Sequence, residues 1–268
     1  MLKLLKYEWK ACARICLPMY AAVLLLAMVN RLTMTEQVQN LLHGIPTVLM
    51  GLLYFAVMVA VFVVTAVIQL QRVYKNLLGD EGYLMFTLPV TVSQHIWSKL
   101  IIAVVMDVIS VIAALLSIAI LGAGLGTLYG VGEFFADMWN MFVSDANNLF
   151  YTIELVLWLL VGGAVFTLFI YLCIALGHLA KKHRVLMAVV WYFVLSTVFQ
   201  FLFMFLIMGV GILPLDGFWV ALENFLRGIG PVASIHVGMV LLCIGTAVPG
   251  AVFFLAIRHI LKNRLNLE

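Results

Sequence analysis

The chain has 268 residues, of which 66% are hydrophobic and only 10% are charged, and its mean hydropathy is +1.18. Soluble globular domains carry far more charge, so this composition excludes them and predicts an integral membrane protein. The formal net charge of +3 gives no reason to expect nucleic acid as a partner, because basic residues in a membrane protein orient the chain and contact lipid headgroups.

Residues 1–14 have the two-sided pattern of an amphipathic helix. Apolar side chains from Leu2 to Cys12 recur at three- and four-residue steps and share one face of a helix. The opposite face is basic and consists of Lys3, Lys6, Lys10 and Arg14. Such a helix is predicted to lie in the membrane interface, with its basic side toward lipid headgroups or a partner. A basic tail that sets the topology and has no partner is an equally good interpretation.

Long runs without charge predict six transmembrane helices. A helix needs roughly 20 apolar residues to cross a hydrocarbon core about 30 Å thick. The predicted spans are 13–32, 46–70, 100–125, 153–177, 185–210 and 233–257. Their apolar runs lack the strict in–out alternation of short segments that a β-barrel requires. We therefore expect an all-α membrane protein that forms one transmembrane domain over residues 1–268.

Lysine and arginine are distributed very unequally between the two sides of these spans. Only Arg31 and Arg227 fall on one side, whereas the other 13 of the 15 basic residues lie on the side of the two termini. The cytoplasmic side of a membrane protein carries the excess of Lys and Arg. The sequence therefore predicts a multi-pass protein of the plasma membrane with both termini in the cytoplasm.

The segment 71–99, between the second and third predicted spans, is the least membrane-like part of the chain. Glycines and acids form a turn, followed by apolar residues and a proline: Gly79, Asp80, Glu81, Gly82, Tyr83, Leu84, Phe86 and Pro89. The glycines allow a sharp turn, and apolar side chains beside acids offer anchors for another protein. We expect a cytoplasmic docking surface. The alternative is that residues 83–88 re-enter the interface and cap the helix bundle.

Two loops on the opposite side carry helical patterns. Residues 128–148, before the fourth span, contain a stripe of aromatic residues. Residues 216–231, before the last span, combine an acidic start, spaced apolar residues and a Gly–Pro end. Both loops are predicted to form short helices at the outer membrane surface. Simple anchoring of the span ends explains their aromatic residues equally well.

Sequence motifs for catalysis and for metal or cofactor binding are missing from the chain. It has no phosphate-binding loop, since no lysine follows a glycine anywhere, and it has no H-E-x-x-H or G-x-S-x-G. The four cysteines fall in or near the spans and are best explained as small packing residues. The sequence therefore predicts no catalytic, cofactor-binding or metal-binding residue.

Two acids are expected close to the membrane. Glu154 is expected to mark the outer end of the fourth span, and Asp107 lies seven residues past the predicted start of the third. A carboxylate at mid-bilayer costs about 2.5–3.5 kcal/mol, but seven residues rise only about 11 Å. Water can therefore reach Asp107 from the cytoplasm. Asp107 is a possible intramembrane polar site, and an ion-coupled secondary carrier that uses it is one alternative function.

Two stretches carry a resemblance to a known family: LLKYEWKACARICLP at the start and RVYKNLLGDEGYLMFTLPVTVSQHIWSKL after two spans. They resemble the permease subunits of bacterial ABC transporters of the type-2 exporter superfamily, in particular small six-span permeases found in Firmicutes. The residues that match are Arg72, Tyr74, Lys75, Gly79–Tyr83, Thr87–Val90 and Ser98–Leu100. The detailed resemblance covers about 45 residues. The rest agrees in span number, topology and the outer helix before the last span.

The resemblance implies a function in ATP-driven export. In that family two six-span subunits form a dimer, and a coupling helix in the first cytoplasmic loop fits a cleft on a separate ATPase chain. ATP and Mg would then bind the ATPase, while residues 79–89 of this chain receive its movement and the N-terminal helix lies alongside. The apolar bundle suits an amphipathic cargo such as an antimicrobial peptide. A homodimer, a pairing with a second permease and a non-transporting membrane scaffold all remain compatible with the sequence.

Overall fold

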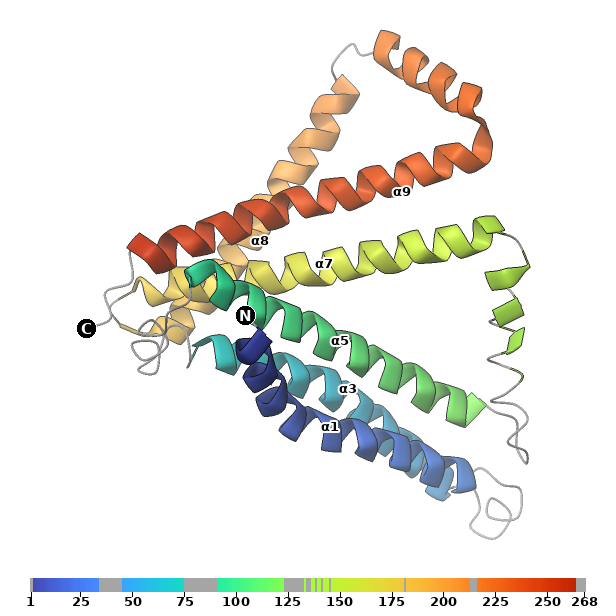
Figure 1. Cartoon of the computed structure of the whole chain (residues 1–268), viewed down its shortest axis with the longest axis vertical. Helices are drawn as coiled ribbons and strands as arrows, with labels where there is room; N and C mark the ends of the chain where they lie inside the picture. Colours follow the sequence, from blue (N-terminus) through green and yellow to red (C-terminus); the bar gives the residue numbers. More distant parts are fainter. Residues whose placement is uncertain are drawn as a thin grey trace. The chain divides into compact units, whose positions relative to one another are not determined.

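The structure, a computed structural model, is helical with no strand in the part of the chain that it describes, apart from a few turn and connecting residues. It describes residues 2–33, 45–74, 91–122, 146–180, 182–212 and 216–263, together with residues 133, 136, 137, 139, 140 and 142–144. In chain order the long helices are α1 (Leu2–Thr33), α3 (Ile45–Val73), α5 (Val92–Gly122), α7 (Ala146–His178), α8 (Arg184–Ile212) and α9 (Asp216–Asn263) (Figure 1). All six are long and apolar enough to cross a membrane, which confirms the predicted number of spans.

Several helices extend well beyond the predicted spans. α5 begins at Val92 rather than at residue 100, and α7 begins at Ala146 rather than at residue 153. The residues added to α5, VSQHIWSK, contain polar groups but neither glycine nor proline, so the helix continues past the apolar run. The predicted N-terminal helix is present and runs without a break through the first span, since α1 covers both.

α9 consists of two helices that meet at Gly230. This residue has φ 83° and ψ 166°, and Pro231 follows it. Glycine adopts positive φ without steric cost, and proline removes the backbone N–H that a continuous helix would use. The helix expected at the outer membrane surface therefore runs from Asp216 to the bend, as predicted for residues 216–231, and the last span follows it (Figure 1).

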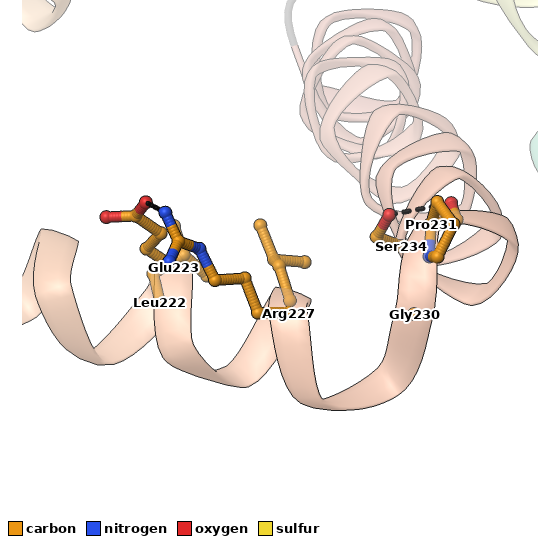
Figure 2. A pocket seen from close by; sticks show the side chains of 7 residues that line it. Leu222, Glu223, Arg227, Gly230, Pro231 and Ser234 are labelled. Carbon is orange, nitrogen blue, oxygen red and sulfur yellow. Dashed lines mark hydrogen bonds and ion pairs between the residues drawn. The ribbon is translucent and has the colours of Figure 1, made fainter.

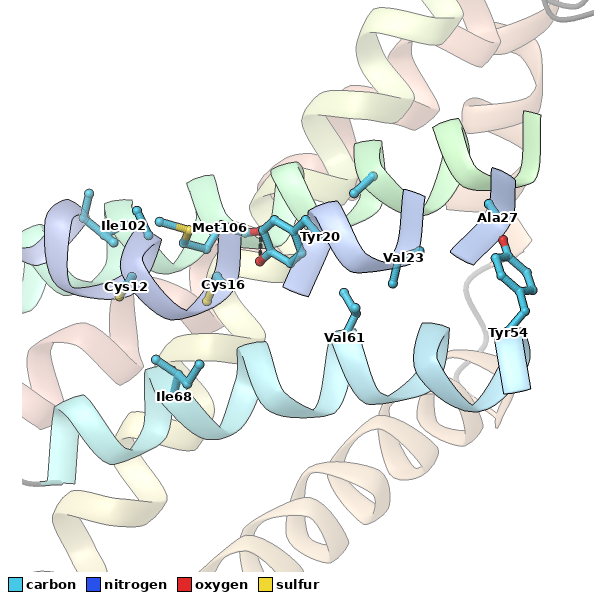
Figure 3. Close-up of a cluster of buried hydrophobic side chains, with 12 residues drawn as sticks. Cys12, Cys16, Tyr20, Val23, Ala27, Tyr54, Val61, Ile68, Ile102 and Met106 are labelled. Carbon is cyan, nitrogen blue, oxygen red and sulfur yellow. Dashed lines mark hydrogen bonds between the residues drawn. The ribbon is translucent and has the colours of Figure 1, made fainter. Parts of the chain in front are cut away.

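The chain divides into two compact units. The first holds α1, α3 and nearly all of α5, and the second holds α8, α9 and nearly all of α7. In the first unit, α1 packs along α3 through side chains that recur at three- or four-residue steps. Figure 3 shows this face of α1 against Val61 and Ile68 of α3 and Ile102 and Met106 of α5; its residues are Cys12, Cys16, Tyr20, Val23 and Ala27.

The second unit is held together by aromatic rings and by a close contact at a glycine. Phe169 of α7 lies 5.6 Å from Phe253 of α9 and 6.1 Å from Phe199 of α8, measured between ring centroids. Gly177 of α7 is so close to α8 that a Cβ there would lie 2.5 Å from the backbone nitrogen of Ala188. Helix packing in membranes favours such small residues, because lipid supplies no hydrophobic force that drives helices together.

Candidate functional site: a buried charge cluster at the base of the α3–α5 loop

A buried carboxylate joins three helices of the first unit. Glu8 of α1 lies 2.6 Å from Arg72 of α3, measured from Oε2 to Nη2, and 2.8 Å from Lys99 of α5, measured from Oε1 to Nζ. Arg72 also donates a hydrogen bond from Nε to Oε2 at 3.0 Å. The side chains of Glu8 and Lys99 are only 6% and 3% exposed, and that of Arg72 is 20% exposed. These three residues are called the Glu8 cluster below.

The helices bring the Glu8 cluster together through their local patterns. Glu8 lies three residues after Leu5 and four before Cys12, so it shares the face of α1 that packs inward. Arg72 is in the last turn of α3, and Lys99 comes seven residues after the start of α5 at Val92. The segment that connects α3 to α5 therefore has both of its flanking helices bound to the Glu8 carboxylate.

The electrostatics of the Glu8 cluster make it a rigid contact. Each carboxylate oxygen has its own cationic partner, and charge-assisted hydrogen bonds of this kind are about twice as strong as neutral ones. Two cations share one anion, so loss of the carboxylate would leave two uncompensated charges in a buried place. Removing one partner from such a buried pair costs about 3–5 kcal/mol. The three helix ends should therefore move together rather than separately.

Further polar contacts continue from the Glu8 cluster along the interior of the first unit. Gln69 of α3 donates to Asp107 Oδ1 of α5 at 2.7 Å and to the carbonyl of Ala103 at 3.2 Å. The Tyr20 hydroxyl of α1 lies 3.1 Å from the Thr65 hydroxyl. Tyr20 also donates a hydrogen bond to the Met106 carbonyl (Figure 3). Such hydrogen bonds between membrane helices contribute about 0.6 kcal/mol each on average, so this seam stabilises helix packing.

The predicted site residues fall into three groups when they are compared with the structure. The eight docking residues between Gly79 and Pro89 lie outside the described residues. Lys3, Lys6, Lys10 and Arg14 are all exposed on α1, on the side away from Cys12 and Cys16. Asp107 accepts its hydrogen bond from Gln69 and lies 15 residues after the start of α5. The longer α5 therefore places Asp107 near the middle of its helix rather than close to the start.

The sequence interpretation missed the Glu8 cluster. Glu8 is the only acid in the first 35 residues of the chain, and it interrupts the apolar face of the amphipathic helix rather than the basic one. An acid on an inward-facing stripe needs a buried cationic partner. The position of Glu8 on the apolar face therefore indicated that it needs a cationic partner. It did not indicate which of the 15 Lys and Arg residues would be that partner.

An open hollow of about 710 Å³ lies at the bend of α9 in the second unit (Figure 2). It is lined by residues from both sides of the bend: Leu222, Glu223, Leu226, Arg227, Gly230, Pro231 and Ser234. Glu223 and Arg227 form an ion pair at 2.5 Å, with side chains 58% and 77% exposed. An exposed pair of this kind contributes little to stability. Among the described residues, no three His, Cys, Asp or Glu side chains gather to hold a metal ion.

The chain matches no protein-family model, no curated protein and no solved structure.

Proposed function

We propose that this chain is the transmembrane permease subunit of an ATP-driven exporter. In this proposal a separate ABC-type ATPase docks on residues 71–99 and hydrolyses ATP, and two permease subunits, identical or homologous, form the path through a bacterial plasma membrane. The Glu8 cluster is the observation that carries the proposal, because one carboxylate binds both flanks of the docking segment. The family resemblance and the lack of a phosphate-binding loop in this chain also support it.

The Glu8 cluster supplies the physical link that coupling requires. A push on the loop would first reach its two flanks, where Arg72 ends α3 and Lys99 lies near the start of α5. Both flanks are tied to α1 through Glu8, and separating either contact would leave a buried charge without its partner. The low-cost response is a joint displacement of all three helices. Binding energy and ATP hydrolysis on the cytoplasmic side would thus be converted into movement of the first unit.

The docking surface can be tested by replacing its apolar anchors. The double variant Tyr83→Ala/Phe86→Ala is expected to lose the ATPase, because large aromatic side chains supply most of the binding energy at protein interfaces. The tagged chain would be expressed from its native chromosomal context and purified in mild detergent. We expect wild-type preparations to contain a chain with a phosphate-binding loop and ATPase activity, and at least tenfold less of both in the double variant.

Phe218→Ala is the matched control for this experiment. Phe218 is an exposed aromatic residue on the outer helix of α9, at the end of the molecule expected outside the cell. Its replacement should leave the amount and activity of the co-purified ATPase unchanged. The docking assignment is wrong if the Tyr83/Phe86 double variant retains the ATPase as well as the control does.

Asp107 distinguishes the exporter from an ion-coupled carrier. Asp107→Asn keeps an oxygen that can accept the hydrogen bond from Gln69, but it removes the titratable group. For an ATP-driven exporter we expect unchanged ATPase co-purification and unchanged protection of cells against a panel of antimicrobial peptides. A pH-gradient-driven flux that occurs without the ATPase and disappears in Asp107→Asn would instead establish a carrier. A membrane scaffold would show neither kind of transport.

A further inference from the structure

The three helices of the second unit carry very few ionisable groups within their apolar lengths. Among Asp, Glu, Lys, Arg and His, residues 146–177 contain only Glu154 and residues 185–212 contain none. Residues 231–257 contain one such residue, His236. These two meet, although they are 82 positions apart, with Glu154 Oε1 at 2.8 Å from His236 Nδ1. An ionisable residue within a membrane span is expensive and usually marks a functional site. The pair therefore needs a functional explanation as well as a structural one.

Aromatic rings surround the imidazole of His236. Tyr151 of α7 stacks on it with ring centroids 4.5 Å apart and an interplanar angle of 22°, and Phe150 approaches edge-on at 6.3 Å. Trp158 lies four residues after Glu154 on α7, so its side chain is on the same face of the helix. The faces of aromatic rings attract cations, and proteins recognise quaternary ammonium ligands with cages of such rings.

Two polar atoms at or near this pair make no hydrogen bond. Within the described part of the chain, Glu154 Oε2 and Trp158 Nε1 are both covered and have no hydrogen-bond partner. His236 uses only one oxygen of the carboxylate. A buried acceptor without a donor costs free energy, and a negatively charged one in a membrane costs more. A cation held against Glu154 would remove that cost.

We propose that Glu154, His236 and the rings of Tyr151 and Trp158 form a binding site for lipophilic cations, in which the cation is held against Oε2 of Glu154. A cation bound there compensates the charge of the carboxylate, and a neutral site within a membrane span is less costly than a charged one. The inference rests on the proposed export function and specifies its class of cargo.

Apart from Glu154 and His236, residues 146–177, 185–212 and 231–257 contain no Asp, Glu, Lys, Arg or His. Tyr151 is a further titratable side chain in contact with His236. The nearest charges along α9, Glu223 and Arg227, pair with each other on the outer helix. The hollow at the bend of α9 includes Ser234, two residues before His236. Ser234 is thus less than one helical turn from His236 along α9, although Glu154, His236, Tyr151 and Trp158 do not line the hollow.

Binding of tetraphenylphosphonium to the purified permease in lipid nanodiscs tests this site. Titration calorimetry measures the affinity. We expect saturable binding, and at least tenfold weaker binding by Glu154→Gln. Glu223→Gln, which removes the exposed acid of α9, should bind as the wild type does. Tetraphenylborate, an anion of the same shape, should bind equally to the wild type and to Glu154→Gln.

A second variant separates loss of the site from loss of the fold. Tyr151→Leu keeps the charges but removes the stacked ring, and it should weaken tetraphenylphosphonium binding several-fold while leaving the unfolding temperature near that of the wild type. Binding that is unaffected by Glu154→Gln or by Tyr151→Leu would overturn the proposal. Absence of binding by the wild type would do the same. The assay needs no ATPase, so its failure is distinct from a failure of the docking experiment.

Discussion

Glu8→Ala is expected to destabilise the first unit by about 3–5 kcal/mol, the cost of breaking a buried ion pair from one side. Arg72 and Lys99 would both lose the carboxylate, and Lys99 would remain almost fully buried. Thermal unfolding in detergent, followed by tryptophan fluorescence, measures the change, with Trp9 next to the altered position as a local reporter. If coupling passes through the Glu8 cluster, any co-purified ATPase should also lose its communication with the permease.

Glu223→Ala provides the control for charge removal as such. The pair of Glu223 and Arg227 is an exposed i,i+4 pair, and such pairs contribute about 0.3–0.5 kcal/mol. Equal destabilisation by Glu8→Ala and Glu223→Ala would contradict the role of burial. Replacing all three members of the Glu8 cluster by leucine should restore much of the stability, since apolar groups tolerate a buried position better than unpaired charges. The restored protein should still fail to couple to the ATPase.

Gly177→Ala is expected to destabilise the second unit by about 1–3 kcal/mol, the usual cost of forcing extra volume into a packed interface. An added Cβ would lie 2.5 to 2.7 Å from the nitrogen, Cα and Cβ of Ala188. Two of these atoms belong to the backbone, so α8 itself would have to move away from α7. Loss of secondary structure on heating, measured by circular dichroism, should therefore occur at a lower temperature than in the wild type.

Gly162→Ala is the matched substitution on the same helix. Nothing lies within 4 Å of a Cβ at that position, and alanine has a higher helix propensity than glycine by about 1 kcal/mol. We expect this variant to unfold at the same temperature as the wild type or slightly above it. The close approach of α7 and α8 would be refuted if Gly177→Ala also proved neutral or stabilising.

The architecture was predictable because it depends on local properties of the chain. Runs of apolar residues long enough to span a membrane specify six helices, since an unpaired backbone is too costly in lipid for any other single-segment structure. The helix ends were less predictable. Hydropathy reports where the chain is apolar, whereas the helix of α5 continues from Val92 through polar residues that nothing interrupts. The outer helix before the last span was predictable from its Gly–Pro end, where Gly230 indeed has positive φ.

The pairing of the buried charges was not predictable in the same way. Glu8 lies 64 residues from Arg72 and 91 residues from Lys99 along the chain. Glu154 was expected to mark the outer end of the fourth span, and nothing in the sequence indicated its contact with His236. The sequence by itself determined that the chain is a six-span membrane protein and where its ionisable residues fall along each helix. Only the tertiary structure decided which of them meet, because that depends on which helices pack together and at what rotation, and neither is encoded in the spacing within a single helix.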